Sequence, residues 1–314
     1  MSTRALLATR SGIRARSAAA GKALLYLVLA FVGALLATFV AKTMIGASLL
    51  DLAKGGLAPG IVRALLLFTG TVVLPSMIAL RLFRDGFATT GWALPNALKL
   101  VGVGVASGFG LLVGIAAILW AIGAITFHYV APSVSAAMVS FAMSAVLWVA
   151  QSAGEEGLNR GYAFLQACRA IAIWPAAILS SVLFMYGHLG NEGETMLGIF
   201  ATGLLGLTLS YSVIKTGSLW FALGFHASWN FTQSFLLGFH NSGVQSPASW
   251  FSTDITGPTL LTGGTVGPEG SILLFPTVLC LLLIIRRIVN EAQPVIRSPG
   301  NDNDRSTNSL RKQS

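Results

Sequence analysis

Charged side chains are scarce in this sequence, and that scarcity excludes an ordinary water-soluble domain. Of 314 residues only 10% are charged, whereas 54% are hydrophobic, and the mean hydropathy is +0.74. A soluble domain carries about 25% charged residues. Cysteine is also scarce: Cys168 and Cys280 both lie in apolar segments, so neither a disulfide framework nor a paired-cysteine metal site is expected. The composition therefore predicts a polytopic membrane protein.

Apolar runs and basic residues together predict an all-α transmembrane helix bundle of about eight spans. The runs cover residues 23–44, 61–83, 98–127, 140–167, 171–189, 196–214, 218–239 and 271–288. With the N-terminus placed in the cytoplasm, sixteen Lys and Arg residues fall inside and only Lys42, Lys54 and Arg63 outside. Cytoplasmic segments collect basic residues, so we expect both termini inside. As the membrane itself we expect a bacterial cytoplasmic membrane, although the charge pattern does not identify the organism. Membrane topology, rather than binding to nucleic acid, then explains the net charge of +9.

Composition divides the chain into six segments. We expect a basic N-tail, N-terminal transmembrane helices, a helical core, an exposed outside loop rich in Gly, Ser, Thr and Pro, a last transmembrane helix and a disordered cytoplasmic C-tail. In that order they cover residues 1–22, 23–139, 140–240, 241–270, 271–290 and 291–314.

Glycines in the third run predict close packing between helices. The run contains two GxxxG spacings, and small residues at that spacing let two helices approach closely in lipid. The glycines are Gly102, Gly104, Gly108, Gly110 and Gly114.

Two adjacent carboxylates, Glu155 and Glu156, stand inside the fourth apolar run. An ionisable residue at membrane depth costs roughly 2.5–3.5 kcal/mol, so such a group needs a partner or a function. On a helix Glu156 and Arg160 lie one turn apart and can neutralise each other. Glu155 is turned by about 100° from Glu156 and faces another neighbour. The pattern predicts one paired carboxylate and one free carboxylate.

Two histidines can reach the free carboxylate. The fourth run must turn into the fifth near Arg169–Pro175, and Glu155 and His188 are equally far from that turn. In antiparallel neighbouring helices these two residues lie at the same depth. In the seventh run His226 and Asn230 share a helix face, where an amide can orient the imidazole, hold a water or bind an oxyanion. We therefore expect a site among the fourth, fifth and seventh spans.

At these residues the chain resembles the CPBP family of intramembrane proteases, also called the CAAX protease or Abi family. Its motifs EExxxR, FxxxH and HxxxN or HxxxD match Glu155-Glu156-Gly-Leu-Asn-Arg160, Phe184-Met-Tyr-Gly-His188 and His226-Ala-Ser-Trp-Asn230. The resemblance covers roughly residues 140–240. It implies an endopeptidase that works in membrane lipid on a membrane-associated peptide or protein, of which a prenylated CAAX-type chain is one kind.

The resemblance also implies a catalytic role for each motif residue. By the resemblance, Glu155 acts as a general base on a water that His188 helps to hold. His226 and Asn230 stabilise the oxyanion. Glu156 and Arg160 hold the helix and its local charge. Zinc is left open: the HExxH signature is absent, yet Glu155, His188 and His226 could form a three-ligand catalytic site. A glutamate-and-water mechanism would use the same residues.

Two other interpretations use the same polar residues. A proton-coupled transporter also needs Glu, His and Arg within its spans; against it, the sequence has no visible inverted repeat. A non-catalytic bacteriocin-immunity or scaffold protein could share the fold, since some family members are linked to self-immunity. Because every motif residue is present, we favour the peptidase.

Overall fold

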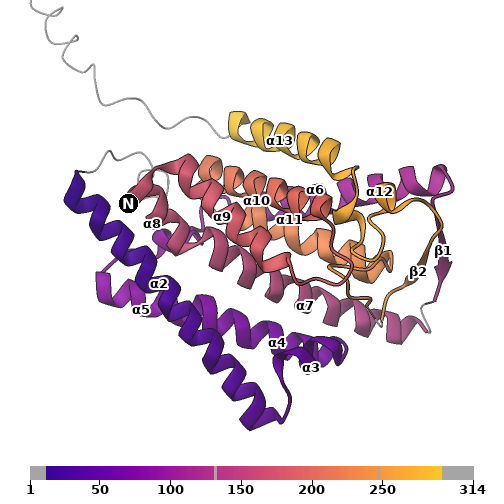
Figure 1. Ribbon diagram of the computed structural model, residues 1–314, viewed down its shortest axis with the longest axis horizontal. Helices are drawn as coiled ribbons and strands as arrows, with labels where there is room; N and C mark the ends of the chain where they lie inside the picture. Colours follow the sequence, from indigo (N-terminus) through magenta and orange to yellow (C-terminus); the bar gives the residue numbers. More distant parts are fainter. Residues whose placement is uncertain (1–11, 131–132, 247, 292–314) are drawn as a thin grey trace, which may run out of the picture.

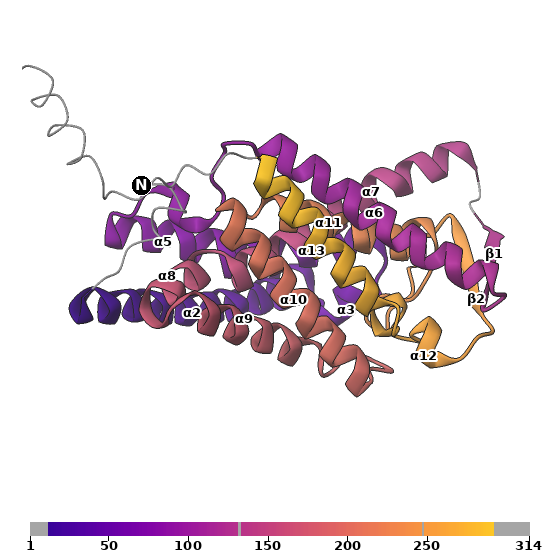
Figure 2. The same cartoon turned by 90° about the horizontal axis from the view of Figure 1, so that it is seen from above.

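In the computed structural model, which describes residues 12–130, 133–246 and 248–291, the apolar runs form helices that lie alongside one another (Figures 1 and 2). In chain order the elements are α2 (Ile13–Val40), α3 (Leu49–Lys54), α4 (Leu57–Phe68), α5 (Leu74–Phe83), α6 (Ala97–Ala121), β1 (Ile125–Tyr129), α7 (Val134–Arg160), α8 (Tyr162–Ile171), α9 (Ile173–His188), α10 (Met196–Thr216), α11 (Trp220–Asn230), β2 (Phe251–Ile255), α12 (Thr259–Thr262) and α13 (Leu274–Glu291). The architecture is the helical bundle that the sequence predicts.

Five helical segments of the described residues are long and apolar enough to cross a membrane. They are Ile13–Ile45, Leu57–Phe83, Ala97–Ala121, Val134–Ile171 and Met196–Thr216. Helix α9 is apolar but only 16 residues long, and α11 and α13 are not among the five. The protein is therefore an integral membrane protein, but the expected number of eight spans is not reached by length and composition alone.

A short β-ribbon interrupts the helical pattern. Helix α6 ends at Ala121, and Gly123 follows with φ of 72°, a left-handed conformation that stops a helix. The β-branched and aromatic residues of Ile125–Tyr129 then pair antiparallel with Phe251–Ile255. The predicted extension of the third run to residue 127 was therefore wrong.

The segment predicted as an exposed outside loop, residues 241–270, folds back onto the bundle. It carries β2 and α12, and Trp250 donates its backbone N–H to the carbonyl of Phe235. Asn241, Thr262 and Val266 are buried. The prediction of an exposed loop was wrong because these few buried positions are scattered among turn residues, where no periodic pattern marks them.

The N-terminal helix begins within the segment predicted as a basic tail. Helix α2 starts at Ile13, and Lys22 forms a salt bridge of 2.8 Å with Asp85. Arg16 donates a hydrogen bond of 2.9 Å to the carbonyl oxygen of Ala170. Residues 1–11 and 292–314, which contain most of the predicted tails, lie outside the described residues.

The turn between the fourth and fifth runs lies where the sequence predicts it. Helix α8 ends at Ile171, and α9 begins at Ile173. Ala172 between them has φ of 89°, which is unfavourable for a residue with a Cβ atom. This reversal sends α9 back along α7 (Figure 1) and brings the FxxxH motif towards the EExxxR motif.

Helix α4 runs parallel to α7 and packs against the part of α7 that comes before Glu155 and Glu156. A Cβ atom on Gly60 would contact Leu147 near the start of α4, and one on Gly154 would contact Phe68 at the end of α4. Because the residue numbers rise together on both helices, Arg63 of α4 lies at the level of the α7 turn before Glu155.

Two of the predicted packing glycines bring α6 against α11. A Cβ atom on Gly104 would overlap the carbonyl oxygen of Phe221, and one on Gly108 would overlap that of Phe225. Gly102, Gly110 and Gly114 have no neighbour within 4 Å of a built Cβ atom. One of the two GxxxG spacings therefore forms a helix contact, which positions the helix that carries His226.

Replacing Gly104 or Gly108 by alanine should destabilise the protein by about 1–3 kcal/mol, since the added methyl group forces two backbones apart. Gly110→Ala is the matched control, because its methyl group meets open space and alanine favours the helix. Thermal unfolding in detergent, followed by circular dichroism, measures the difference. Equal stability of Gly104→Ala and Gly110→Ala would contradict the packing.

Candidate active site

A buried ion pair joins Glu156 and Arg160 on α7. Nη1 of Arg160 donates to Oε1 of Glu156 over 2.7 Å, and both side chains are fully buried. The remaining guanidinium nitrogens reach the carbonyl oxygen of Gly206 at 3.2 and 3.3 Å and the hydroxyl of Ser210 at 3.3 Å, both on α10. The guanidinium carbon lies 4.8 Å from the ring centroid of Phe184 on α9. The pair predicted from i,i+4 spacing thus ties α7 to α9 and α10.

His226 lies between the two glutamates. Its Nδ1 is 2.8 Å from Oε1 of Glu156, and its Nε2 is 3.6 Å from Oε2 of Glu155. Because an ionised carboxylate can only accept, Nδ1 carries the proton in the contact with Glu156. The Glu155 contact is too long for a direct hydrogen bond. His226 is therefore fixed by Glu156 and presents its other nitrogen to Glu155.

The carboxylate of Glu155 is more exposed than that of Glu156. Its side chain is 31% exposed, against 0% for Glu156. Nε2 of Gln151, one helical turn earlier, donates a hydrogen bond of 3.1 Å to the Glu155 carboxylate. The neighbouring glutamates on one helix thus have different environments, as the sequence predicts.

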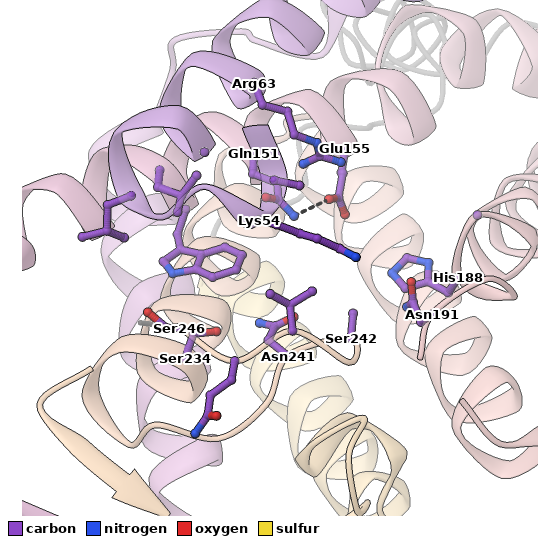
Figure 3. A pocket seen from close by; sticks show the side chains of 18 of the residues that line it. Lys54, Arg63, Gln151, Glu155, His188, Asn191, Ser234, Asn241, Ser242 and Ser246 are labelled. Carbon is purple, nitrogen blue, oxygen red and sulfur yellow. Dashed lines mark hydrogen bonds between the residues drawn. The ribbon is translucent and has the colours of Figure 1, made fainter. Parts of the chain in front are cut away.

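Glu155 and His188 line a common cavity of about 500 Å³, which we call the main cavity (Figure 3). Its volume is typical of ligand pockets, about 300–1,000 Å³. Nδ1 of His188 is 2.7 Å from the carbonyl oxygen of Phe184, which can only accept, so Nδ1 carries the proton. The lone pair of Nε2 is left for another group. Two residues that the sequence places at the same depth thus line one cavity.

Asn230 receives a hydrogen bond from a residue that the sequence did not single out. Nδ2 of Asn241 donates to Oδ1 of Asn230 over 3.1 Å. The bond occupies the amide oxygen of Asn230 and leaves its NH₂ group to donate elsewhere. Both asparagines line a smaller cavity of about 50 Å³ together with Glu155 and His226. All six predicted site residues are thus found at or beside one centre.

A further carboxylate borders the smaller cavity from the segment before α13. Glu269 accepts hydrogen bonds from the backbone N–H and the hydroxyl of Ser242, at 2.6 and 2.8 Å. Burial raises the pKa of the Glu269 carboxyl above its ordinary value, against the lowering effect of those hydrogen bonds. The contact fixes the start of the segment that carries Asn241.

The three candidate metal ligands have suitable chemistry but not a converging geometry. The Nδ1 proton of His188 is held by a carbonyl and that of His226 by a carboxylate, the outer contacts common for zinc-bound histidines. Within the described ranges, however, no three His, Cys, Asp or Glu side chains are grouped so that they could hold a metal ion. Glu155, His188 and His226 in this arrangement do not fit a zinc ion, and no catalytic step is derived through one.

Three contacts of the site were missed by sequence reasoning. Gln151 could have been found, since it precedes Glu155 by one turn of the same helix. Gly206 contributes a backbone carbonyl and Asn241 lies in a turn-rich segment, so neither carries a sequence signal for its role.

Glu156→Gln should lower the yield of folded protein, because it leaves the Arg160 charge buried without its partner. Losing one member of a buried pair costs about 3–5 kcal/mol. Adding Arg160→Gln should restore part of the yield, since the pair then becomes two neutral groups. The monodisperse fraction on size exclusion measures both effects, with Glu155→Gln as the matched control. Wild-type yield of Glu156→Gln would contradict a structural role for the pair.

Comparison with known protein families finds a match to part of the chain. A family model described as type II CAAX prenyl endopeptidase, Rce1-like, matches residues 137–232, just under a third of the chain. The matched segment contains all six predicted site residues. No curated protein and no solved structure matches the chain. Residues 137–232 are therefore similar to the CAAX prenyl endopeptidases, in a chain with five helical segments long and apolar enough to cross a membrane.

Proposed function

We propose that the protein is an intramembrane endopeptidase in which Glu155 activates water for attack on a peptide bond. One observation carries this proposal: of two adjacent glutamates, Glu156 is held by Arg160 and His226, whereas Glu155 borders the main cavity opposite His188. The family match supports a CAAX-type peptidase in general. The mechanism and the residue roles are inferred from the contacts.

Glu155 and His188 can bind and deprotonate one water molecule. The carboxylate of Glu155 accepts a proton from the water, and the lone pair of Nε2 of His188 accepts its second hydrogen in a hydrogen bond. The water oxygen then adds to the scissile carbonyl carbon. Glu155 next gives the proton to the leaving nitrogen as the carbon–nitrogen bond breaks, so that no proton is gained or lost. General base catalysis of this kind contributes about 10²–10⁴-fold.

Asn230 and His226 are placed to stabilise the tetrahedral oxyanion. The oxygen of Asn230 is occupied by Asn241, so its NH₂ group donates. His226 is oriented through Nδ1 by Glu156, and as an imidazolium it donates from Nε2 on the side of Glu155. Donors already aimed at the developing charge lower the barrier because they need no reorganisation.

A third cavity, which is apolar, favours a prenylated substrate. It has a volume of about 560 Å³, and its walls are almost entirely apolar residues of α2, α8 and α9. Leu158, Asn159 and Leu183 line both this cavity and the main cavity. An isoprenoid chain in the apolar cavity would therefore lie next to a peptide whose scissile bond is at Glu155.

Glu155→Gln should lower peptide release by at least about 10²-fold while expression stays near normal. The substitution keeps the shape and most hydrogen bonding of the side chain but removes the proton acceptor. Purified protein in lipid nanodiscs, assayed against a library of farnesylated peptides, gives the measurement. Glu192→Gln, at an exposed glutamate outside both catalytic cavities, is the matched control. Wild-type release by Glu155→Gln removes the proposed base.

Chelation should leave the rate of peptide release within about twofold. The proposed mechanism uses a side-chain base, so removal of divalent ions does not remove a reactant. Wild-type protein is dialysed against chelator and assayed before and after zinc is added back. Loss of activity on dialysis with recovery on zinc addition would instead establish a metal enzyme.

Ala167→Phe should raise KM for a farnesylated peptide about tenfold and change KM for its unprenylated form little. The phenyl ring occupies part of the apolar cavity. Displacing even two methylene groups costs roughly 1.6 kcal/mol at about 0.8 kcal/mol each, which is more than tenfold in affinity. Ala106→Phe, at an exposed alanine of α6, is the control. Equal effects on both peptides would place the isoprenoid elsewhere.

A further inference from the structure

The main cavity contains two cationic side chains that the catalytic scheme does not use. Lys54 and Arg63 line it together with Glu155 and His188. In Figure 3 both basic side chains point into the space that Glu155 and His188 border. Among the described residues, neither Lys54 nor Arg63 forms a salt bridge or a hydrogen bond. The cavity therefore combines groups that can hydrolyse a peptide with groups that can bind an anion.

Local structure places the backbone of Lys54 and of Arg63 beside the cavity. Helix α3 is capped by reciprocal hydrogen bonds between Ser48 and Asp51 and ends at Lys54. The chain then turns through Gly56, whose φ of 94° favours glycine, and enters α4. Arg63 follows Gly60, which packs on α7, by three residues and so lies on nearly the same face.

The charge distribution of the sequence also distinguishes this pair. In the predicted topology only three basic residues lie outside, and Lys54 and Arg63 are two of them. Basic residues are disfavoured on that side of membrane proteins, so their presence calls for a local role. The third, Lys42, does not line the main cavity.

We propose that Lys54 and Arg63 bind the free C-terminal carboxylate of the substrate, so that the enzyme selects peptides that end a short distance after the scissile bond. This inference rests on the proposed peptidase function. Every peptide with a free C-terminus ends in a carboxylate. When such a peptide lies across Glu155 and His188, this carboxylate is the anion available to the two cations. Arginine binds a carboxylate through two parallel hydrogen bonds, and lysine adds a compact charge. An extended residue spans at most about 3.6 Å, so a leaving peptide of few residues suffices.

The phosphate of an anionic lipid presents similar chemistry to the same two cations. The carboxylate is favoured because the pair lies in the same cavity as the catalytic residues rather than on a separate surface. A lipid headgroup would respond to the composition of the bilayer, whereas a substrate carboxylate would respond to chemical blocking of the chain end.

The decisive comparison is between one farnesylated peptide as the free acid and the same peptide as its C-terminal amide. Wild-type protein in phosphatidylcholine nanodiscs should cleave the acid with a kcat/KM at least tenfold above that of the amide. The double variant Lys54→Gln, Arg63→Gln should treat acid and amide alike. Lys42→Gln, which removes a charge from the same predicted side but not from the cavity, should keep the wild-type preference. Equal cleavage of acid and amide by wild type, or a preference kept by the double variant, overturns the inference.

Two further measurements separate this inference from the proposed function and from lipid binding. A short peptide with the sequence after the scissile bond, as acid and as amide, is titrated onto wild type and the double variant. Tenfold tighter binding of the acid to wild type alone supports the carboxylate site even if no peptide is cleaved. Cleavage that depends on Glu155 but not on the chain end leaves the peptidase standing and removes the carboxylate site. If the double variant changes only the response to phosphatidylglycerol, the cations bind lipid phosphate and the inference fails.

Discussion

The fully buried ion pair between Glu156 and Arg160 is the interaction on which the rest of the site depends. Through it α7 contacts the Gly206 carbonyl of α10, the Phe184 ring of α9 and, by way of Glu156, the His226 ring of α11. Hydrophobic side chains often fill such a position with equal or greater stability. What the charged pair adds is direction, because guanidinium and carboxylate bind their partners at defined angles.

The site leaves little space for a side chain at Gly206. A Cβ atom there would come within 3.1 Å of Nη2 of Arg160 and 3.3 Å of the Phe184 ring. Because Gly206 has no side chain, the guanidinium of Arg160 can reach the backbone carbonyl at this position. In the same way, Gly104 and Gly108 let α6 hold α11 close, so that His226 comes to Glu156. Small residues on the surrounding helices thus set the position of the charged ones.

The order of the two glutamates explains how one helix can carry both the framework and the reactive group. A rotation of about 100° per residue directs Glu156 into the bundle and Glu155 towards the main cavity. Among the described residues, the side chain within salt-bridge range of the proposed base is His226, at 3.6 Å. Hydrolysis and substrate selection would use the same cavity, with the base on α7 and the two cations on α3 and α4.

The sequence predicted those parts of the structure that follow from helix periodicity and failed for contacts that do not. The Glu156–Arg160 pair, the turn at Ala172 and the common cavity of Glu155 and His188 follow from spacing along helices. The Gly206 carbonyl has no side-chain signature, and Asn241 reaches Asn230 only because residues 241–270 fold back. The β-ribbon was hidden because Ile125 and Phe127 are as apolar as a membrane helix.

A single-turnover reaction in ¹⁸O-labelled water tests the role of Glu155 most directly. With enzyme in excess over a cleavable peptide, each molecule turns over at most once, and mass spectrometry then reads the new carboxyl group of the product and the enzyme peptide that contains Glu155. If Glu155 is a base acting on water, the product carries one solvent oxygen and Glu155 carries none. Solvent ¹⁸O in the carboxyl group of Glu155 would show that it attacks the substrate itself and would contradict the account.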